Sequence, residues 1–262
     1  MKIIVCIKQV PDTNEVKLDP KTGTLIRDGV PSIINHDDMN ALEEALALKD
    51  RYKDVEITAL TMGPPQADVA LREALAMGAD RAILVSDRAF AGADTWATSN
   101  TLTAAIKKIG SYDMIFCGRQ AIDGDTAQVG PQIAEKLDLP QVTYVQKMEV
   151  NGDTVTAQRA LEDGYEVIEV IMPCVLTAIK ELNAPRYASV KGIFEAYREK
   201  TVESWTAKDI EIDPEIIGLN GSPTNVRRTF TPEPKGKGTM LTGCDRGTVC
   251  DLFGRLKEKH II

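Results

Sequence analysis

The chain has 262 residues, of which 43% are hydrophobic and 27% charged, a balance that supports a packed core and excludes global disorder. The length suits one large domain, or one domain with an appendage. The 31 basic and 39 acidic side chains give a formal net charge of −8. An acidic chain without a basic, aromatic-rich patch argues against general nucleic-acid binding.

No apolar run reaches the roughly 18 residues that a membrane span needs. The N-terminal sequence MKIIVCIKQVPD is too polar, and its apolar part too short, for a secretory signal peptide. We therefore expect a cytoplasmic protein without a membrane span.

Cysteine and histidine are too few and too scattered to form a metal site. The cysteines are odd in number and contain no CxxC pair, which makes reduced and mostly buried thiols the expected state; they are Cys6, Cys117, Cys174, Cys244 and Cys250. The only histidines are His36 and His260, so Ser-His-Asp chemistry would have to rest on His36. We predict no metal and no catalytic side chain, and expect a bound cofactor or a partner to supply the chemistry.

The first half of the chain alternates between predicted strands and helices. The strands are continuous apolar runs, at residues 3–7, 55–62, 82–85 and 114–117. The helices have apolar residues at three- and four-residue spacing, at residues 38–52, 67–77, 95–109 and 126–137. This order predicts right-handed βαβ units and a doubly wound, mostly parallel sheet covered on both faces.

The second half changes rhythm from about Gln141. Further strands are predicted at residues 142–150, 154–161, 166–171 and 173–179, and we expect them to form an antiparallel addition at the edge of the sheet. Two helices are predicted later, at residues 189–200 and 249–257. Between them, residues 214–245 are irregular and contain Pro214, Gly218, Gly221, Pro223, Pro232 and Pro234. We interpret this stretch as an arm that wraps a partner; a loop without a partner is the alternative.

Ligands of open α/β sheets bind at the carboxyl ends of the strands, and the segment after the fourth strand is the most informative. It reads GRQAIDGDTAQVGP and places Gly124, Thr126 and Gly130 where strand passes into helix. Small residues let a ligand approach the backbone, and a helix N-terminus offers free N–H groups to an anion. Thr126 and Gln128 add side-chain donors.

Two acidic residues of this segment complicate a phosphate site. Asp123 and Asp125 would repel an anion unless they cap the helix or meet ribose hydroxyls, and Arg119 could offset their charge. A capped helix without a ligand is the alternative. The segment is neither a P-loop nor GxGxxG, so it does not support a standard ATPase or Rossmann dehydrogenase.

Weaker features follow the other strands. Asp94 or Thr95 is expected to cap a helix, and Phe90 could stack on a ligand ring or belong to the core. Gly63-Pro64-Pro65 is expected to start a helix. One polar residue of Asn35–Asp38 is expected to cap the first helix; His36 could contact a nucleotide or lie in solvent, and Lys8 is expected to pair with nearby acids.

These segments resemble the β subunit of electron transfer flavoprotein. The similar segments are VCIKQVPD, ALAMGADRA, GRQAIDGDTAQVGP and NAPRYAS, and the most specific is AQRALEDGYEVIEVIMPCVLT. That last segment fits the family signature through Arg159, Glu162, Asp163, Gly164, Glu166, Ile168, Pro173 and Thr177. The resemblance covers nearly the whole chain.

The resemblance implies a heterodimer with a larger α subunit. It implies an α/β domain over residues 1–190, similar to the adenine-nucleotide α-hydrolase fold, and a C-terminal arm over residues 191–262 that wraps the α subunit. Together with the residues chosen above, it gives this set of expected cofactor contacts: Cys6, Asn35, His36, Asp37, Asp38, Met62, Phe90, Asp94, Thr95, Ala121, Ile122, Asp123, Gly124, Asp125, Thr126, Ala127, Gln128, Val129, Gly130, Pro131 and Gln132.

The nucleotide differs between two branches of the family: a structural AMP in the respiratory branch, and a second FAD in the electron-bifurcating branch of anaerobes. The segments GDTAQVGP and SDRAFAGADTWATS are similar to the bifurcating branch. That branch implies NADH as electron donor, with ferredoxin or flavodoxin and an acyl-CoA dehydrogenase as acceptors.

The helix after NAPRYAS departs from the lysine-rich respiratory pattern. Val190 fits the family's apolar docking position, whereas Glu195 stands where lysine is common. Partner choice therefore should not be taken from respiratory members. Two alternatives remain open at this point: a respiratory-type β subunit that binds AMP and only shuttles electrons, and a stand-alone adenine-nucleotide-binding regulatory module.

Overall fold

The computed structural model describes residues 1–12, 31–227, 236 and 238–262. These residues form two compact units, Met1–Val226 and Arg227–Ile262. The first unit contains the sheet and its covering helices, and the second contains one helix, α6 (Arg246–Glu258). No helix within the described ranges combines the length and the apolar character needed to cross a membrane.

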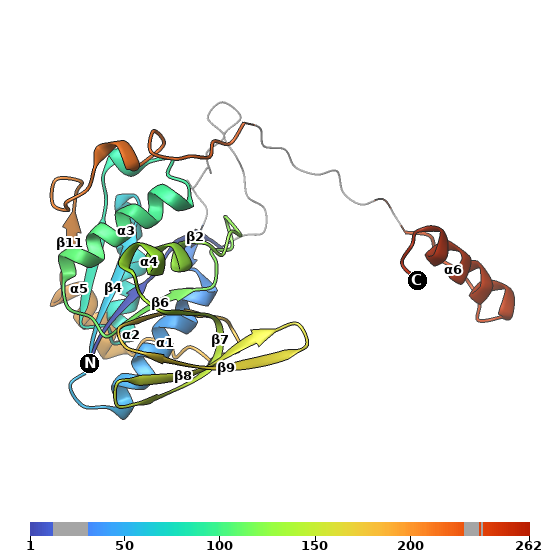
Figure 1. The fold of residues 1–262 in the computed structure, drawn as a ribbon, viewed down its shortest axis with the longest axis horizontal. Coiled ribbons are helices and arrows are strands. Elements are labelled where there is room, and N and C mark those ends of the chain that lie inside the picture. The colour runs from blue at the N-terminus through green and yellow to red at the C-terminus, as the bar shows by residue number, and fades with distance from the viewer. Residues whose placement is uncertain (13–30, 228–235, 237) are drawn as a thin grey trace. The chain divides into compact units, whose positions relative to one another are not determined.

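The first unit is built on a nine-stranded sheet of order β11-β5-β4-β1-β6-β10-β7-β8-β9 (Figure 1). The strands of this sheet are β1 (Lys2–Cys6), β4 (Glu56–Met62), β5 (Arg81–Val85), β6 (Met114–Gly118), β7 (Gln141–Asn151), β8 (Thr154–Leu161), β9 (Gly164–Ile171), β10 (Cys174–Ala178) and β11 (Val202–Trp205). Two shorter strands, β2 (Gln9–Pro11) and β3 (Ser32–Ile34), pair antiparallel beside it. The predicted α/β class with a mostly parallel sheet is confirmed.

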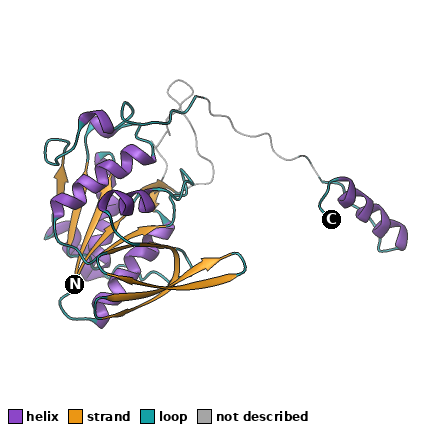
Figure 2. Ribbon diagram, viewed as in Figure 1, coloured by secondary structure: helices purple, strands orange, loops and turns teal. Residues whose placement is uncertain are grey.

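The antiparallel part of the sheet is smaller than the sequence predicts. β8 and β9 pair antiparallel at the edge, as expected, and continue β7 as a long ribbon (Figure 2). β10, predicted in the edge addition, instead lies between β6 and β7 and is parallel to both. All five residues of β10 are buried, because helices cover both faces of the sheet at this position. β11, at the opposite edge, was not predicted from the sequence.

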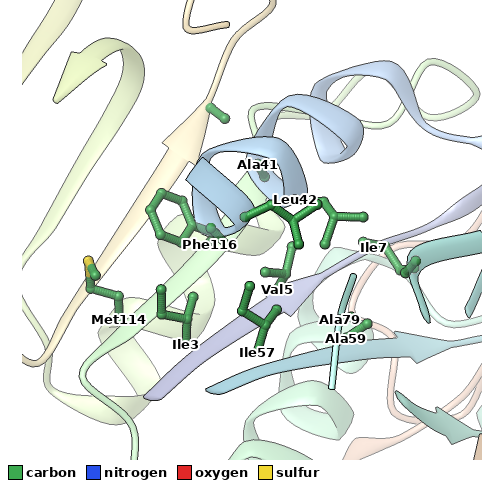
Figure 3. Close-up of a cluster of buried hydrophobic side chains, with 14 of the residues drawn as sticks. Ile3, Val5, Ile7, Ala41, Leu42, Ile57, Ala59, Ala79, Met114 and Phe116 are labelled. Atoms are coloured by element: carbon green, nitrogen blue, oxygen red, sulfur yellow. The ribbon is translucent and has the colours of Figure 1, made fainter. Parts of the chain in front are cut away.

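Helices cover the two faces of the sheet in pairs. The pairs are α1 (His36–Arg51) with α2 (Asp68–Met77), and α3 (Thr95–Ile109) with α4 (Val129–Leu137). Ala41 and Leu42 of α1 pack on one face, against Val5, Phe116 and other apolar side chains (Figure 3). The second pair packs on the other face, in a separate cluster that includes the residues Cys6, Cys117, Leu102 and Ile133. The short turn η1 (Pro65–Ala67) leads into α2, as Gly63-Pro64-Pro65 predicts.

The first unit extends further beyond residue 190 than the sequence predicts. Helix α5 (Val190–Arg198) packs on α2, where Arg72 donates a 2.7 Å hydrogen bond to the Ala196 carbonyl. β11 then pairs with β5, and residues 214–226 bind back through η3 (Pro214–Ile216). The predicted division at 190/191 is therefore too early, and the compact unit ends at Val226. Of the predicted irregular arm, residues 228–235 and 237, including Pro232 and Pro234, lie outside the described residues.

Candidate functional site

The strand order of the sheet reverses between β1 and β6. After β1 the chain builds β4 and β5 on one side, and it then returns through α3 to form β6 on the other side. Open α/β sheets bind ligands in the crevice at such a switch point. Cys6 and Cys117 are partners in the β1–β6 register and form its last pair before the crevice. Strand order therefore selects the carboxyl ends of β1 and β6, called the crevice below, as the candidate site.

Asp38 closes the crevice on the α1 side. One carboxylate oxygen accepts the backbone N–H of Lys8 at 2.8 Å, and the other accepts that of Gly118 at 3.0 Å. A single side chain thus ties the loop after β1 to the end of β6. The approach requires glycine at 118, because a Cβ there would lie 2.7 Å from the backbone nitrogen of Asp38.

The environment of Asp38 changes its acidity. Burial raises the pKa of Asp38 to about 7, although the N–H groups of Lys8 and Gly118 act in the opposite direction. Asp37 is also buried, and burial raises its pKa despite the nearby Arg119. The Asp37 and Arg119 side chains lie 3.2 Å apart, so Arg119 is engaged here rather than beside Asp123 and Asp125.

Asn35 stands at the N-cap position of α1 but does not cap the helix. Its side chain donates to the Gln120 carbonyl at 2.8 Å and accepts the N–H of Ile122 at 3.0 Å. The predicted side-chain cap of this helix is therefore wrong. Asn35 instead fixes the start of the loop between β6 and α4, and His36 is an exposed residue in the first turn of α1.

The loop between β6 and α4 holds its two acidic residues in partnered positions. Asp123 forms a 2.6 Å ion pair with Lys8, which confirms the expectation for that lysine. Asp125 accepts a hydrogen bond from the side chain of Gln120. Asp125 and Ala127 have positive φ values of 50° and 52°, so the chain turns twice before α4 begins. The predicted helix start at Thr126 is therefore three residues too early.

The N-terminus of α4 is open. Its N-cap residue, Gln128, makes no side-chain cap, and neither Asp123 nor Asp125 caps the helix. Within the described residues, the backbone N–H groups from Thr126 to Gly130 meet no hydrogen-bond acceptor. A Cβ at Gly124 would find no atom of the described residues within 4 Å, so none of them fills the space beside this loop. These N–H groups can donate hydrogen bonds to a bound anion.

Glycine 130 has a packing role that the sequence does not reveal. A Cβ at this position would lie 2.7 Å from the Cγ2 atom of Thr177 and 3.4 Å from the Cβ of Cys117. Gly130 therefore lets α4 approach β6 and β10 closely. The sequence predicts that glycine at this position gives a ligand access to the backbone. The structure shows instead that glycine is needed here for close packing of α4 on the sheet.

The segment after β5 reaches the same crevice from α3. Asp94 caps α3 by accepting the N–H of Ala97 at 3.0 Å, as predicted. The Thr95 hydroxyl donates to the Gln128 side-chain carbonyl at 2.8 Å and so joins the N-termini of α3 and α4. Phe90 is only 4% exposed and belongs to the core cluster, which favours the core alternative over stacking on a ligand.

Comparison with known proteins identifies the family. The family model for the electron transfer flavoprotein domain matches residues 22–210. The electron transfer flavoprotein subunit beta of Thermoanaerobacterium thermosaccharolyticum is 61% identical over 262 residues, which cover 100% of both chains. The chain belongs to the electron transfer flavoprotein β-subunit family.

Two further relatives of this β subunit have more specific names. The caffeyl-CoA reductase-Etf complex subunit CarD of Acetobacterium woodii is 60% identical over 263 residues and 100% of both chains. The acryloyl-CoA reductase electron transfer subunit gamma of Anaerotignum propionicum is 53% identical over 271 residues, again over 100% of both chains. The family resemblance inferred from the sequence motifs is thereby confirmed.

The structure brings together most of the expected contacts of this β subunit. Cys6, Asp38 and the loop before α4 meet at the crevice, and Met62 ends β4 beside the core cluster that contains Cys6. His36, Asp37 and Ile122 also line a groove of about 820 Å³ next to residues 180–188. Val190, the expected docking residue, lies on α5 and is 86% exposed. Sequence reasoning missed Gly118 and Gln120, whose partners come from distant segments.

Proposed function

We propose that this chain is the β subunit of an electron-bifurcating electron transfer flavoprotein in the cytoplasm. It would bind, at the crevice between β1 and β6, an FAD that receives a hydride from NADH. One electron would pass to ferredoxin or flavodoxin, and the other to an acyl-CoA dehydrogenase through the FAD of an α subunit.

The charges around the crevice suit a dinucleotide with a negatively charged diphosphate. Lys8 neutralises Asp123, Gln120 binds Asp125, and Asp94 is engaged by the N–H of Ala97 and by Thr224. No carboxylate of this loop is thus left without a partner to repel an anion. No described residue accepts a hydrogen bond from the amides between Thr126 and Gly130, so the chemistry of the donor set fits the group.

The observation that carries the choice of FAD is the link between Thr95 and Gln128. These residues belong to the two segments, SDRAFAGADTWATS and GDTAQVGP, that are similar to the bifurcating branch, and their side chains share a 2.8 Å hydrogen bond. A ligand larger than an adenosine phosphate could extend from one segment toward the other. When bound, FAD supplies the redox chemistry, while these residues bind and orient it.

The names of two relatives support an acyl-CoA-directed partner. One relative is named as part of a caffeyl-CoA reductase-Etf complex, and the other as an electron transfer subunit of acryloyl-CoA reductase. At 60% and 53% identity over full length, these proteins favour a dehydrogenase or reductase of acyl-CoA as the acceptor for this chain as well.

Helix α6 supports an obligate protein partner. Val249, Leu252, Phe253 and Leu256 recur at three- and four-residue spacing, and the first three are about half exposed or more. Removing residues 227–262 should weaken the α/β pair while leaving the first unit folded. The cut belongs after Val226, because residues 214–226 pack on the first unit. A truncated chain that still copurifies fully with the α subunit would show that this segment is not the arm.

The nucleotide content of the coexpressed α/β complex tests the proposal. The complex is denatured, and the released nucleotides are separated and counted against protein. We expect about two FAD and no AMP per heterodimer, and bleaching of flavin absorbance on addition of NADH. About one FAD and one AMP, with no response to NADH, would instead identify the respiratory type. A β chain that folds and stays monomeric without an α subunit would favour the regulatory module.

A further inference from the structure

Two thiols stand side by side at the base of the crevice. Cys6 and Cys117 are direct partners in the parallel β1–β6 register, and both side chains belong to the cluster on the α3–α4 face. Neighbouring strands lie about 4.8 Å apart. This separation falls within the Cα–Cα range of about 4.4–6.8 Å that disulfides span.

Cys117 lies against the first turn of α4, and Cys6 is its register partner on β1. Cys6 is 8% exposed and Cys117 is 5% exposed, so each has only a small opening to solvent. A Cβ built on Gly130, in the first turn of α4, would lie 3.7 Å from the sulfur of Cys117. A molecule that occupies the crevice would therefore cover the only pair of described cysteines that occupy paired positions on neighbouring strands.

We propose that Cys6 and Cys117 form a modification site, a dithiol that small-molecule disulfides convert into an intrachain disulfide when the crevice is empty. A bound nucleotide protects the dithiol. The protection rests on the proposed function, because it requires the nucleotide to occupy this crevice, whereas the pairing of the two thiols does not.

The conversion is a balanced thiol–disulfide exchange. The Cys6 thiolate attacks the small disulfide and releases one small thiolate, leaving a mixed disulfide on Cys6. The Cys117 thiolate then attacks the sulfur of Cys6 and releases the second small thiolate. The two protein thiols lose two electrons and two protons, and the small disulfide gains them as two thiols.

Cys6 is the attacking thiol because it is the more exposed of the pair. The hydrogen bond with Cys6, together with burial, raises the pKa of the Cys117 thiol. Cys117 is therefore the resolving partner, and its small thiolate fraction limits the second step near neutral pH. We expect disulfide formation to accelerate as the pH rises.

The test uses the full chain in complex with its α subunit and carries Cys244→Ser and Cys250→Ser, which remove the two exposed thiols. The complex is stripped of nucleotide and treated with 2-hydroxyethyl disulfide, alone or with added FAD or AMP. Remaining thiols are then alkylated, and tryptic peptides are identified by mass spectrometry. Cys174 is fully buried in β10 and reports unfolding, because it becomes alkylated only if the sheet opens.

In the stripped complex we expect a peptide pair linked through Cys6 and Cys117, with Cys174 unmodified. At a nucleotide concentration ten times its Kd, the linked peptide should form about tenfold more slowly, because only about one site in eleven is empty. Cys117→Ser should stop at a mixed disulfide on Cys6, and Cys6→Ser should give neither product.

Three results would overturn parts of this inference in distinguishable ways. If Cys6 and Cys117 stay unlinked in the stripped, folded complex, the dithiol is refuted and the proposed function is untouched. If the link forms equally fast with FAD or AMP saturating the complex, the protection is refuted and the nucleotide lies elsewhere. If Cys6→Ser leaves a mixed disulfide on Cys117, the assigned order of attack is wrong.

Discussion

The two sides of the crevice, beside α1 and beside α4, differ in what meets the backbone donors there, although neither helix has a side-chain cap. On the α1 side, Asp38 accepts the N–H groups of Lys8 and Gly118 and fills the space between the strand ends. On the α4 side, no side chain caps the helix, and the amides from Thr126 to Gly130 meet no acceptor within the described residues. The strand-end donors beside α1 are thus bound by a side chain of the protein, while the amides at the start of α4 are left for a ligand.

The difference teaches how an acidic chain can build an anion site. Beside α1, the Asp38 side chain takes the place of an anion, because two backbone donors from the ends of β1 and β6 converge on it. Near α4 the carboxylates instead interact with side chains: Asp123 forms an ion pair with Lys8, and Asp125 accepts a hydrogen bond from Gln120. The same residue type therefore binds backbone donors on one side, and on the other side it is held by side chains, one of them a cation.

Replacing Gly118 should have the largest effect, because the new side chain would disturb the contact between Asp38 and the end of β6. In Gly118→Ala the new Cβ would meet the backbone nitrogen of Asp38 at 2.7 Å, and backbone atoms there cannot move alone. We expect the free energy of unfolding in urea to fall by about 3 kcal/mol or more. Gly124→Ala is the matched control, since its Cβ meets no atom of the described chain within 4 Å and should leave stability nearly unchanged. Equal stabilities of the two variants would remove the distinction between the sides.

A second prediction uses the acidity of Asp38. Its pKa is about 7 in the folded protein and 3.8 ordinarily, so the folded state holds a proton that the unfolded chain has released. This contribution to stability is complete below about pH 4 and is lost as the pH rises through about 7. The free energy of unfolding should thus fall with pH over that window by up to about 1.4 kcal/mol per unit.

Asp38→Asn should abolish that slope. The raised pKa of Asp37 is present in both proteins and cancels when the two curves are subtracted. Urea unfolding at several pH values between about 4 and 8 measures the difference. Parallel curves for the two proteins would mean that Asp38 is ionised throughout and that its two N–H donors outweigh its burial.

The location of the crevice could be predicted from the sequence, whereas the difference between its α1 side and its α4 side could not. The alternation of apolar runs and helical patterns predicts the strands and the loop after β6, because each depends on nearby residues. The structural role of Asp38 could not be predicted, since its hydrogen-bond donors lie 30 and 80 positions away in the sequence. β10 was misplaced for the same reason: its residues predict a strand but do not determine which neighbours it pairs with.

On the open side, Gly124→Val should weaken nucleotide binding without weakening the fold. The valine side chain would enter space that no described residue fills, so stability should stay within about 0.5 kcal/mol of the parent. It would also exclude a ligand that approaches the backbone, and we expect about a tenfold loss of affinity. Isothermal titration of the stripped complex with FAD measures this, and Gly124→Ala should lose much less. Unchanged affinity for both variants would place the ligand away from this loop.

The smallest effect should come from the ion pair that neutralises the loop. In Lys8→Met, Asp123 loses its partner, and a negative charge then lies near the amides that would receive the phosphate. Because the Lys8 side chain is 42% exposed, solvent screens much of this change, and we expect only about a threefold loss of affinity for AMP. Adenosine, which lacks the phosphate, should bind both proteins equally, and raising the salt concentration should shrink the AMP difference. An equal loss for adenosine and AMP would show that Lys8 shapes the loop rather than balancing its charge.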